Sequence, residues 1–154
     1  MLVRLANLDD IDAVVDMVRH QIEDVSTDTV FDGAVVREQF ASYLSTANPT
    51  IFVAVDDSDH VVGMVWATIN GYEYRRGLRV FQRVIYVSPE NRGTRAAVLL
   101  TRHLIQWAKG LGASEIVGGN AITFQPERTA RFLKRFGFQV IGYAMSLRLD
   151  GATP

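Results

Sequence analysis

The fold is decided by the stretch VFQRVIYVSPENRGTRAAVLL, residues 80–100. Its first half is rich in β-branched and aromatic residues, which predicts a strand over Arg79–Val87. The polar loop Arg92-Gly93-Thr94-Arg95 follows, and small and apolar residues then predict a helix from about Arg95 to Leu111. A helix N-terminus carries unpaired backbone N–H groups and a positive partial charge. We therefore expect this turn to bind an anion such as a phosphate.

The part of the chain before this stretch has the periodicity of two helices and a hairpin. A short strand is predicted at Leu2–Leu5, and apolar residues at helical spacing then predict a helix over Ile11–Val25. A loop at residues 26–33 leads to a second helix, which ends at Ala47-Asn48-Pro49. The next segments predict two antiparallel strands and a polar connection, at Ile51–Val55, His60–Asn70 and residues 71–78.

The part of the chain after residue 111 predicts a strand, a helix and a strand. A short strand is expected at Ser114–Gly119, and Pro126 suits the first position of a helix that Gly137 would cap. Alternating residues predict a final strand over Phe138–Leu149. The order β-α-α-β-β-β-α-β-α-β favours one α/β domain over residues 1–150, with a tail at 151–154. We expect a central mixed, mostly antiparallel sheet flanked by helices.

Composition excludes several classes of protein. The chain has 154 residues, 48% hydrophobic and 21% charged, as in a globular domain. A net charge of −1 argues against nucleic-acid binding. There is no cysteine, and His20, His60 and His103 lack the spacing of metal ligands, so no metal site is expected. The longest apolar run, Val61–Ile69, is too short to span a bilayer. We expect a cytoplasmic protein without a membrane partner.

The chain resembles the GNAT superfamily of acetyl-CoA-dependent N-acetyltransferases. The resemblance rests on the order of elements, on Val87-Ser88-Pro89-Glu90-Asn91-Arg92-Gly93 and on Phe132-Leu133-Lys134-Arg135-Phe136-Gly137-Phe138. It implies acetyl-CoA as the cofactor and direct transfer of the acetyl group to a primary amine within a ternary complex. The acceptor would be a small molecule or a protein, and the resemblance leaves a homodimer open.

The family's pyrophosphate loop reads Gln/Arg-x-x-Gly-x-Gly/Ala, and here Arg95 stands where the family has its first glycine. Arg95 would either add a charge-assisted bond to a phosphate or block the site. The resemblance also implies that the strand edge pairs with the pantetheine arm and that an asparagine lies beside the cofactor. The implied cofactor-binding residues are Ile85, Tyr86, Val87, Arg92, Gly93, Thr94, Arg95, Ala96, Ala97 and Asn120.

The sequence offers only isolated candidates for the catalytic acid and the catalytic base. Leu133 stands where family members often have the tyrosine that protonates the leaving thiolate. Tyr143 is a candidate acid and Glu73 a candidate base, because the central strand offers Gln82 and Arg83 but no carboxylate. Other acids near the two-helix junction would either line an acceptor pocket or be ordinary solvated charges; these are Glu23, Asp28 and Asp32. Trp66 is interpreted as core or groove packing.

A second hypothesis belongs to a different class. The chain would be a GNAT-fold binding or structural module without catalysis, associated with a bacteriophage, that has kept or lost CoA binding. Arg95 in place of glycine and Leu133 in place of tyrosine motivate it. Under either hypothesis the sequence leaves the amine open among polyamines, aminoglycosides, amino acids, protein amines and modified nucleobases.

Overall fold

The computed structural model describes residues 1–25, 29–119, 126–145, 147 and 149. The chain divides into two compact units, Met1–Gly118 and Gly119–Pro154, which are treated separately below. The single domain expected over residues 1–150 stays a prediction. In the described part of the chain, no helix is both long and apolar enough to cross a membrane.

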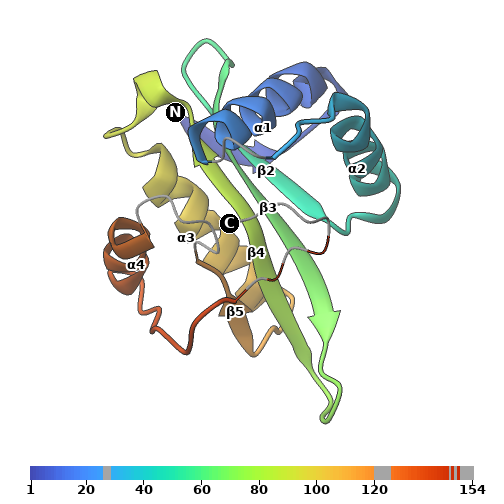
Figure 1. The fold of residues 1–154 in the computed structure, drawn as a ribbon, viewed down its shortest axis with the longest axis vertical. Helices are drawn as coiled ribbons and strands as arrows, with labels where there is room; N and C mark the ends of the chain where they lie inside the picture. Colours follow the sequence, from blue (N-terminus) through green and yellow to red (C-terminus); the bar gives the residue numbers. More distant parts are fainter. Residues whose placement is uncertain (26–28, 120–125, 146, 148, 150–154) are drawn as a thin grey trace. The chain divides into compact units, whose positions relative to one another are not determined.

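The first unit is built on a mixed sheet of five strands in the order β1-β2-β3-β4-β5 (Figure 1). The first four strands pair antiparallel, and the last pairs parallel to β4. The prediction of a mixed, mostly antiparallel sheet flanked by helices is confirmed. The strands are β1 (Leu2–Leu5), β2 (Thr50–Val55), β3 (Val61–Gly71), β4 (Leu78–Val87) and β5 (Glu115–Val117).

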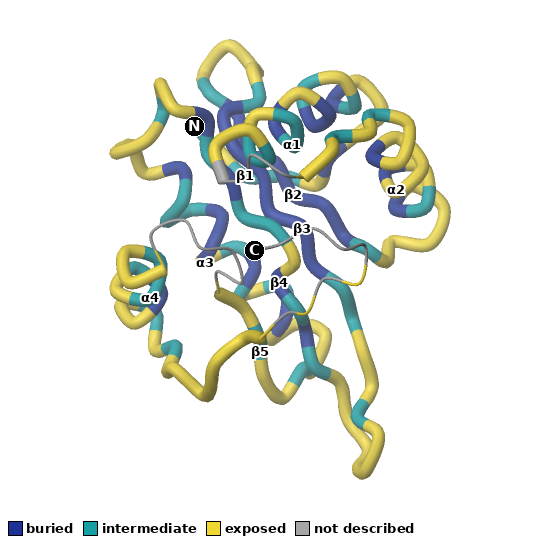
Figure 2. The backbone as a smooth tube through the Cα atoms, in the orientation of Figure 1, coloured by how far each residue is buried: buried dark blue, intermediate teal, exposed yellow. Residues whose placement is uncertain are grey.

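Helices cover both faces of this sheet. The helices α1 (Ile11–Val25) and α2 (Gly33–Thr46) pack on one face, and α3 (Ala96–Gly110) packs on the other (Figure 1). Strand β2 shows why both faces are apolar, since alternate residues point to opposite sides. Ile51 and Val53 join the core under α1 and α2, whereas Phe52 and Ala54 join the core under α3. Figure 2 shows β2 buried along its length.

Short polar motifs lie at the starts of the helices. Asn7 caps the 3-10 turn η1 (Leu8–Asp10) that leads into α1, and its side chain accepts a hydrogen bond from the backbone of Asp9. Asp32 caps α2 by accepting from the backbone N–H of Ala34 at 2.9 Å. A second 3-10 turn, η2 (Pro89–Asn91), connects β4 to the loop before α3.

Strand β4 contains one irregularity. Trp66 of β3 lies opposite Val84, but the next residue, Ala67, lies opposite Gln82. Arg83 is therefore the extra residue of a β-bulge. A bulge places two residues opposite one, so the alternation of side chains restarts beyond it.

The second unit contains α4 (Pro126–Lys134), which begins at the proline predicted to open it. It ends where the backbone N–H of Phe136 donates to the carbonyl of Leu133, and Gly137 has a φ of +91°. The prediction of a final strand over Phe138–Leu149 is wrong for the described residues of that segment, none of which is in a strand. Alternation records which side chains could share a face, but a strand exists only where backbone groups pair with a neighbour. Beyond Phe138, no such pairing occurs among these residues.

Candidate functional site

The loop between β4 and α3 presents unpaired backbone donors. Hydrogen bonds within residues 88–94 brace it: the N–H of Arg92 donates to the carbonyl of Pro89, and that of Thr94 to the carbonyl of Asn91. Gly93 has a φ of +90°, which favours glycine. The N–H groups that donate to no described group are those of Gly93, Arg95, Ala97 and Val98. Unpaired N–H groups at a helix N-terminus are suited to an anion.

Arg95 does not distort this loop. Its backbone is helical, with φ −78° and ψ 0°, so a side chain is tolerated without strain. The side chain is exposed, and its charge contributes to a lowered pKa of Asp57, for which the main cause is the hydrogen bond from the N-terminal amine. The glycine of the family motif is thus not required by the backbone conformation at this position.

Arg92 is held by a carboxylate from α1. Its guanidinium forms an ion pair with Asp24, and the Tyr86 hydroxyl donates to the same carboxylate oxygen at 3.1 Å. The hydrogen bond from Arg92 is the main cause of a lowered pKa of Asp24, whereas burial is the main cause of a raised pKa of Tyr86. Arg92 Nε also donates to the carbonyl of Val87 at 3.3 Å. The loop between β4 and α3, the end of β4 and the end of α1 are thereby connected.

Beyond its pairing with β5, the outer edge of β4 is open. Strand β5 pairs only with Arg79–Phe81, so residues 82–87 have no partner on that side among the described residues. The N–H of Ser88 donates to Val62 on β3. The backbone groups of Val87, one residue earlier, therefore face away from β3. An extended ligand can add to such an edge in the manner of a further strand.

The Gln82 side chain indicates whether the residues beside this edge fit a pantetheine arm. Its side-chain oxygen is buried and accepts no hydrogen bond from a described residue. Gly118 packs closely against this side chain, because a Cβ there would lie 3.0 Å from the Cβ of Gln82 and 3.3 Å from its Oε1. A buried acceptor without a donor suits the amide N–H groups of a pantetheine chain. The residues present therefore fit the cofactor that the resemblance implies.

A groove lies on the face of the sheet that α1 and α2 cover, where α2 and the following loop meet β3 and β4. Its volume is about 630 Å³, within the usual range for a small-molecule site. Phe81, Arg83 and Val84 all reach it because the bulge places both residues 83 and 84 on the same face. The other lining residues are Gln39, Asn48, Pro49, Trp66, Thr68 and Asn70.

The predicted acid and base are not among the residues that line this groove. Glu73 accepts two hydrogen bonds from Arg79, at 2.9 and 3.1 Å, at the far end of the β3–β4 hairpin. Tyr143 is 98% exposed and belongs to the second unit. Asn120 and Asp28 lie outside the described residues. Of the remaining acids, Asp32 serves as the cap of α2 and Glu23 lies exposed on α1.

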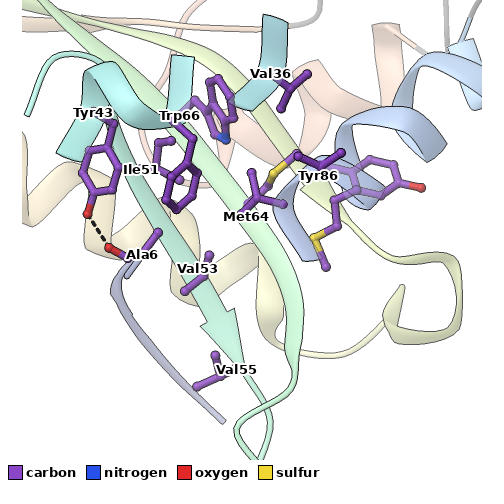
Figure 3. Close-up of a cluster of buried hydrophobic side chains, with 13 residues drawn as sticks. Ala6, Val36, Tyr43, Ile51, Val53, Val55, Met64, Trp66 and Tyr86 are labelled. Carbon is purple, nitrogen blue, oxygen red and sulfur yellow. Dashed lines mark hydrogen bonds between the residues drawn. The ribbon is translucent and has the colours of Figure 1, made fainter. Parts of the chain in front are cut away.

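Sequence reasoning missed Asp24 and Gln39, the groove residue on α2. Asp24 is separated from Arg92 by 68 positions, and nothing in its local pattern distinguishes it from other helix-surface acids. Gln39 occupies an ordinary helical position before Phe40. The interpretation of Trp66 as core or groove packing agrees with its position, because it packs beneath α2 and also lines the groove (Figure 3).

The model of the acetyltransferase (GNAT) family matches residues 15–138. The structure resembles a transcriptional regulator from Bacillus halodurans C-125, with a TM-score of 0.80, 20% identity, and coverage of 96% of this chain and 98% of that one.

Two further structures with the same fold are acetyltransferases. One is from Trypanosoma brucei, with a TM-score of 0.76, 16% identity, and coverage of 96% and 98% of the two chains. The other is an aminoglycoside 6′-N-acetyltransferase from Acinetobacter haemolyticus, with a TM-score of 0.69, 19% identity, and coverage of 96% and 100%. No curated protein sequence is significantly similar to this chain. Because the family model covers most of the chain and the fold agrees, the chain belongs to the GNAT family of acetyltransferases.

Proposed function

We propose that the protein transfers an acetyl group from acetyl-CoA to a primary amine, by direct attack of the amine within a ternary complex. The observation that carries this proposal is the position of two features on one strand. The open edge of β4 leads into the loop with unpaired N–H groups, and the opposite face of the same strand lines the groove. An acyl donor and an acceptor bound at these places would meet at β4.

Each part of the site has a task in this scheme. The unpaired N–H groups at the start of α3 would hold the pyrophosphate, and the edge at Ile85–Val87 would hold the pantetheine arm. A backbone N–H near the bulge would polarise the thioester carbonyl. The bound thioester supplies the activated acetyl group.

Proton transfer would depend on solvent. The described lining of the groove contains no carboxylate and no imidazole, so the amine would lose its proton to water. Positioning and carbonyl polarisation would then supply most of the acceleration.

Isothermal titration calorimetry with acetyl-CoA and with CoA tests the cofactor part of this proposal. We expect a binding isotherm for each ligand with one site per chain. Thiol release from acetyl-CoA, measured across a panel of primary amines, tests the transfer. Absence of binding at millimolar ligand would contradict the cofactor assignment.

The second candidate function is a CoA-binding module without transfer. It is favoured by Leu133, an apolar residue of α4 at the position where the family often has its acid. Normal CoA binding without thiol release for any amine would support this candidate over the enzyme.

A further inference from the structure

The groove beside β4 has a distinctive charge. Among its described lining residues, Arg83 is the only ionisable group, and the remaining polar groups are amides, one hydroxyl and one indole. A cationic acceptor would place its charge next to an arginine with no acid in the lining to offset it. The groove is therefore electrostatically unsuited to polycations and suited to an anion.

Arg83 has hydrogen-bonding capacity to spare. It is exposed, and it forms no ion pair or hydrogen bond with any described residue. The neighbouring arginine on the same strand is different, since Arg79 pairs with Glu73 and lies 5.0 Å above the ring of Tyr72. A planar guanidinium with free N–H groups binds a carboxylate through two parallel hydrogen bonds.

A second polar group among the lining residues also lacks a described partner. Trp66 is 8% exposed and lines the groove, and its buried Nε1–H has no acceptor among the described residues. Buried indole N–H groups normally have a partner. Asn48 is not available, because its side chain exchanges two hydrogen bonds with the backbone of Ile69.

We infer that the acceptor is a primary amine that also carries a carboxylate, such as an amino acid, and that Arg83 binds this carboxylate. The inference rests on the proposed function, because it names the substrate class of the same site. The amine nitrogen forms a bond to the acetyl carbon, the carbon–sulfur bond of the thioester breaks, and the thiolate takes up a proton while the amine releases one. The products are an N-acetylated acid and free CoA.

Matched acceptors test the charge requirement directly. Amino acids, their amides and diamines of similar length are compared by thiol release from acetyl-CoA. We expect kcat/KM to be about 10- to 100-fold higher for each acid than for its amide, as for the loss of a charge-assisted hydrogen bond. Diamines are expected to be the poorest acceptors. Equal rates for acid and amide, or a preference for diamines, would overturn the inference.

Variants then assign the effect to Arg83. In Arg83→Gln we expect the preference for acids over amides to disappear, with the KM for acetyl-CoA unchanged. Arg76→Gln is the matched control, because Arg76 is exposed at the hairpin end and does not line the groove. An unchanged preference in Arg83→Gln would refute the assignment. Trp66→Phe retains the aromatic ring but lacks the N–H, and should weaken acid binding without removing the preference.

Calorimetry separates failure of the inference from failure of the proposed function. The protein saturated with CoA is titrated with an amino acid, for the wild type and for Arg83→Gln. If no amine is acetylated, the proposed function fails. Arg83-dependent binding of the acid would still support Arg83 as the carboxylate-binding residue, and absence of such binding would refute the inference.

Discussion

Gly63 lies at a point where β3 and β4 are too close for a side chain. It sits opposite Val87, and a Cβ at this position would be 2.9 Å from the carbonyl oxygen of Tyr86 and 3.2 Å from Leu100. The nearest atom belongs to the backbone of a paired strand, so the two strands would have to separate. Overpacking of this kind costs about 1–3 kcal/mol, partly offset by about 0.4–1 kcal/mol from the stiffer unfolded chain.

Gly71 provides the matched control because it lies on the same strand and a Cβ there would meet nothing within 4 Å. Gly71→Ala should show only the effect on the unfolded chain, so the difference between the two variants isolates the steric cost. We expect Gly63→Ala to melt about 2–12 °C below Gly71→Ala, at about 2–4 °C for each kcal/mol in a chain of this size.

Thermal and urea unfolding of both variants measure this difference. Gly63→Ala should also bind acetyl-CoA more weakly, because the displaced Tyr86 and Val87 belong to the proposed pantetheine edge. Equal stability of the two variants would show that the close approach of β3 and β4 at Gly63 is not as described.

Three further changes have defined outcomes. Tyr43→Phe removes a buried 2.6 Å hydrogen bond to a backbone carbonyl, and urea unfolding should show a loss of about 1–2 kcal/mol. In Asp24→Asn the ion pair with Arg92 is lost. The pKa of Asp24 is lowered in the folded state, so this pair stabilises the wild type by less than about 1 kcal/mol, as for a partly exposed pair. The stabilisation should be present above about pH 4 and disappear as the pH falls through the folded pKa. Unfolding of the wild type and the variant, measured against pH, tests this. Arg95→Ala should weaken CoA binding a few-fold at low salt, and less at high salt, whereas Arg102→Ala on the same helix should not.

Local sequence patterns predicted most of the helices and strands of the first unit. The alternation at Ile51–Val55 and the helical spacing before Leu111 report the faces that an element buries, and both elements form close to the predicted bounds. The final strand predicted at Phe138–Leu149 is wrong for its described residues, because alternation says nothing about a pairing partner. The pair of Asp24 and Arg92 was equally beyond reach, since it depends on contact between distant segments.

The predicted acceptor pocket shows why charges are hard to interpret from a sequence. A sequence shows how many acids lie near a site, but not which of them already form hydrogen bonds or ion pairs with local partners. Here Asp32 caps the start of α2, and Glu73 forms an ion pair with Arg79. The sequence alone does not distinguish Arg83 from the other cations, yet it is the charge that remains without a described partner in the groove.

The bulge at Arg83 links the two halves of the proposed site. An uninterrupted β4 would alternate strictly, so a single strand face could not hold both Arg83 and Val84. The extra residue turns Arg83 toward the groove, and it lies next to Gln82, where pairing with β5 has just ended. The same local change therefore sets the charge of the acceptor groove and lies at the start of the edge proposed for the cofactor. Acceptor choice and acyl-donor position would then depend on one backbone irregularity in β4, a strand that carries no carboxylate or imidazole.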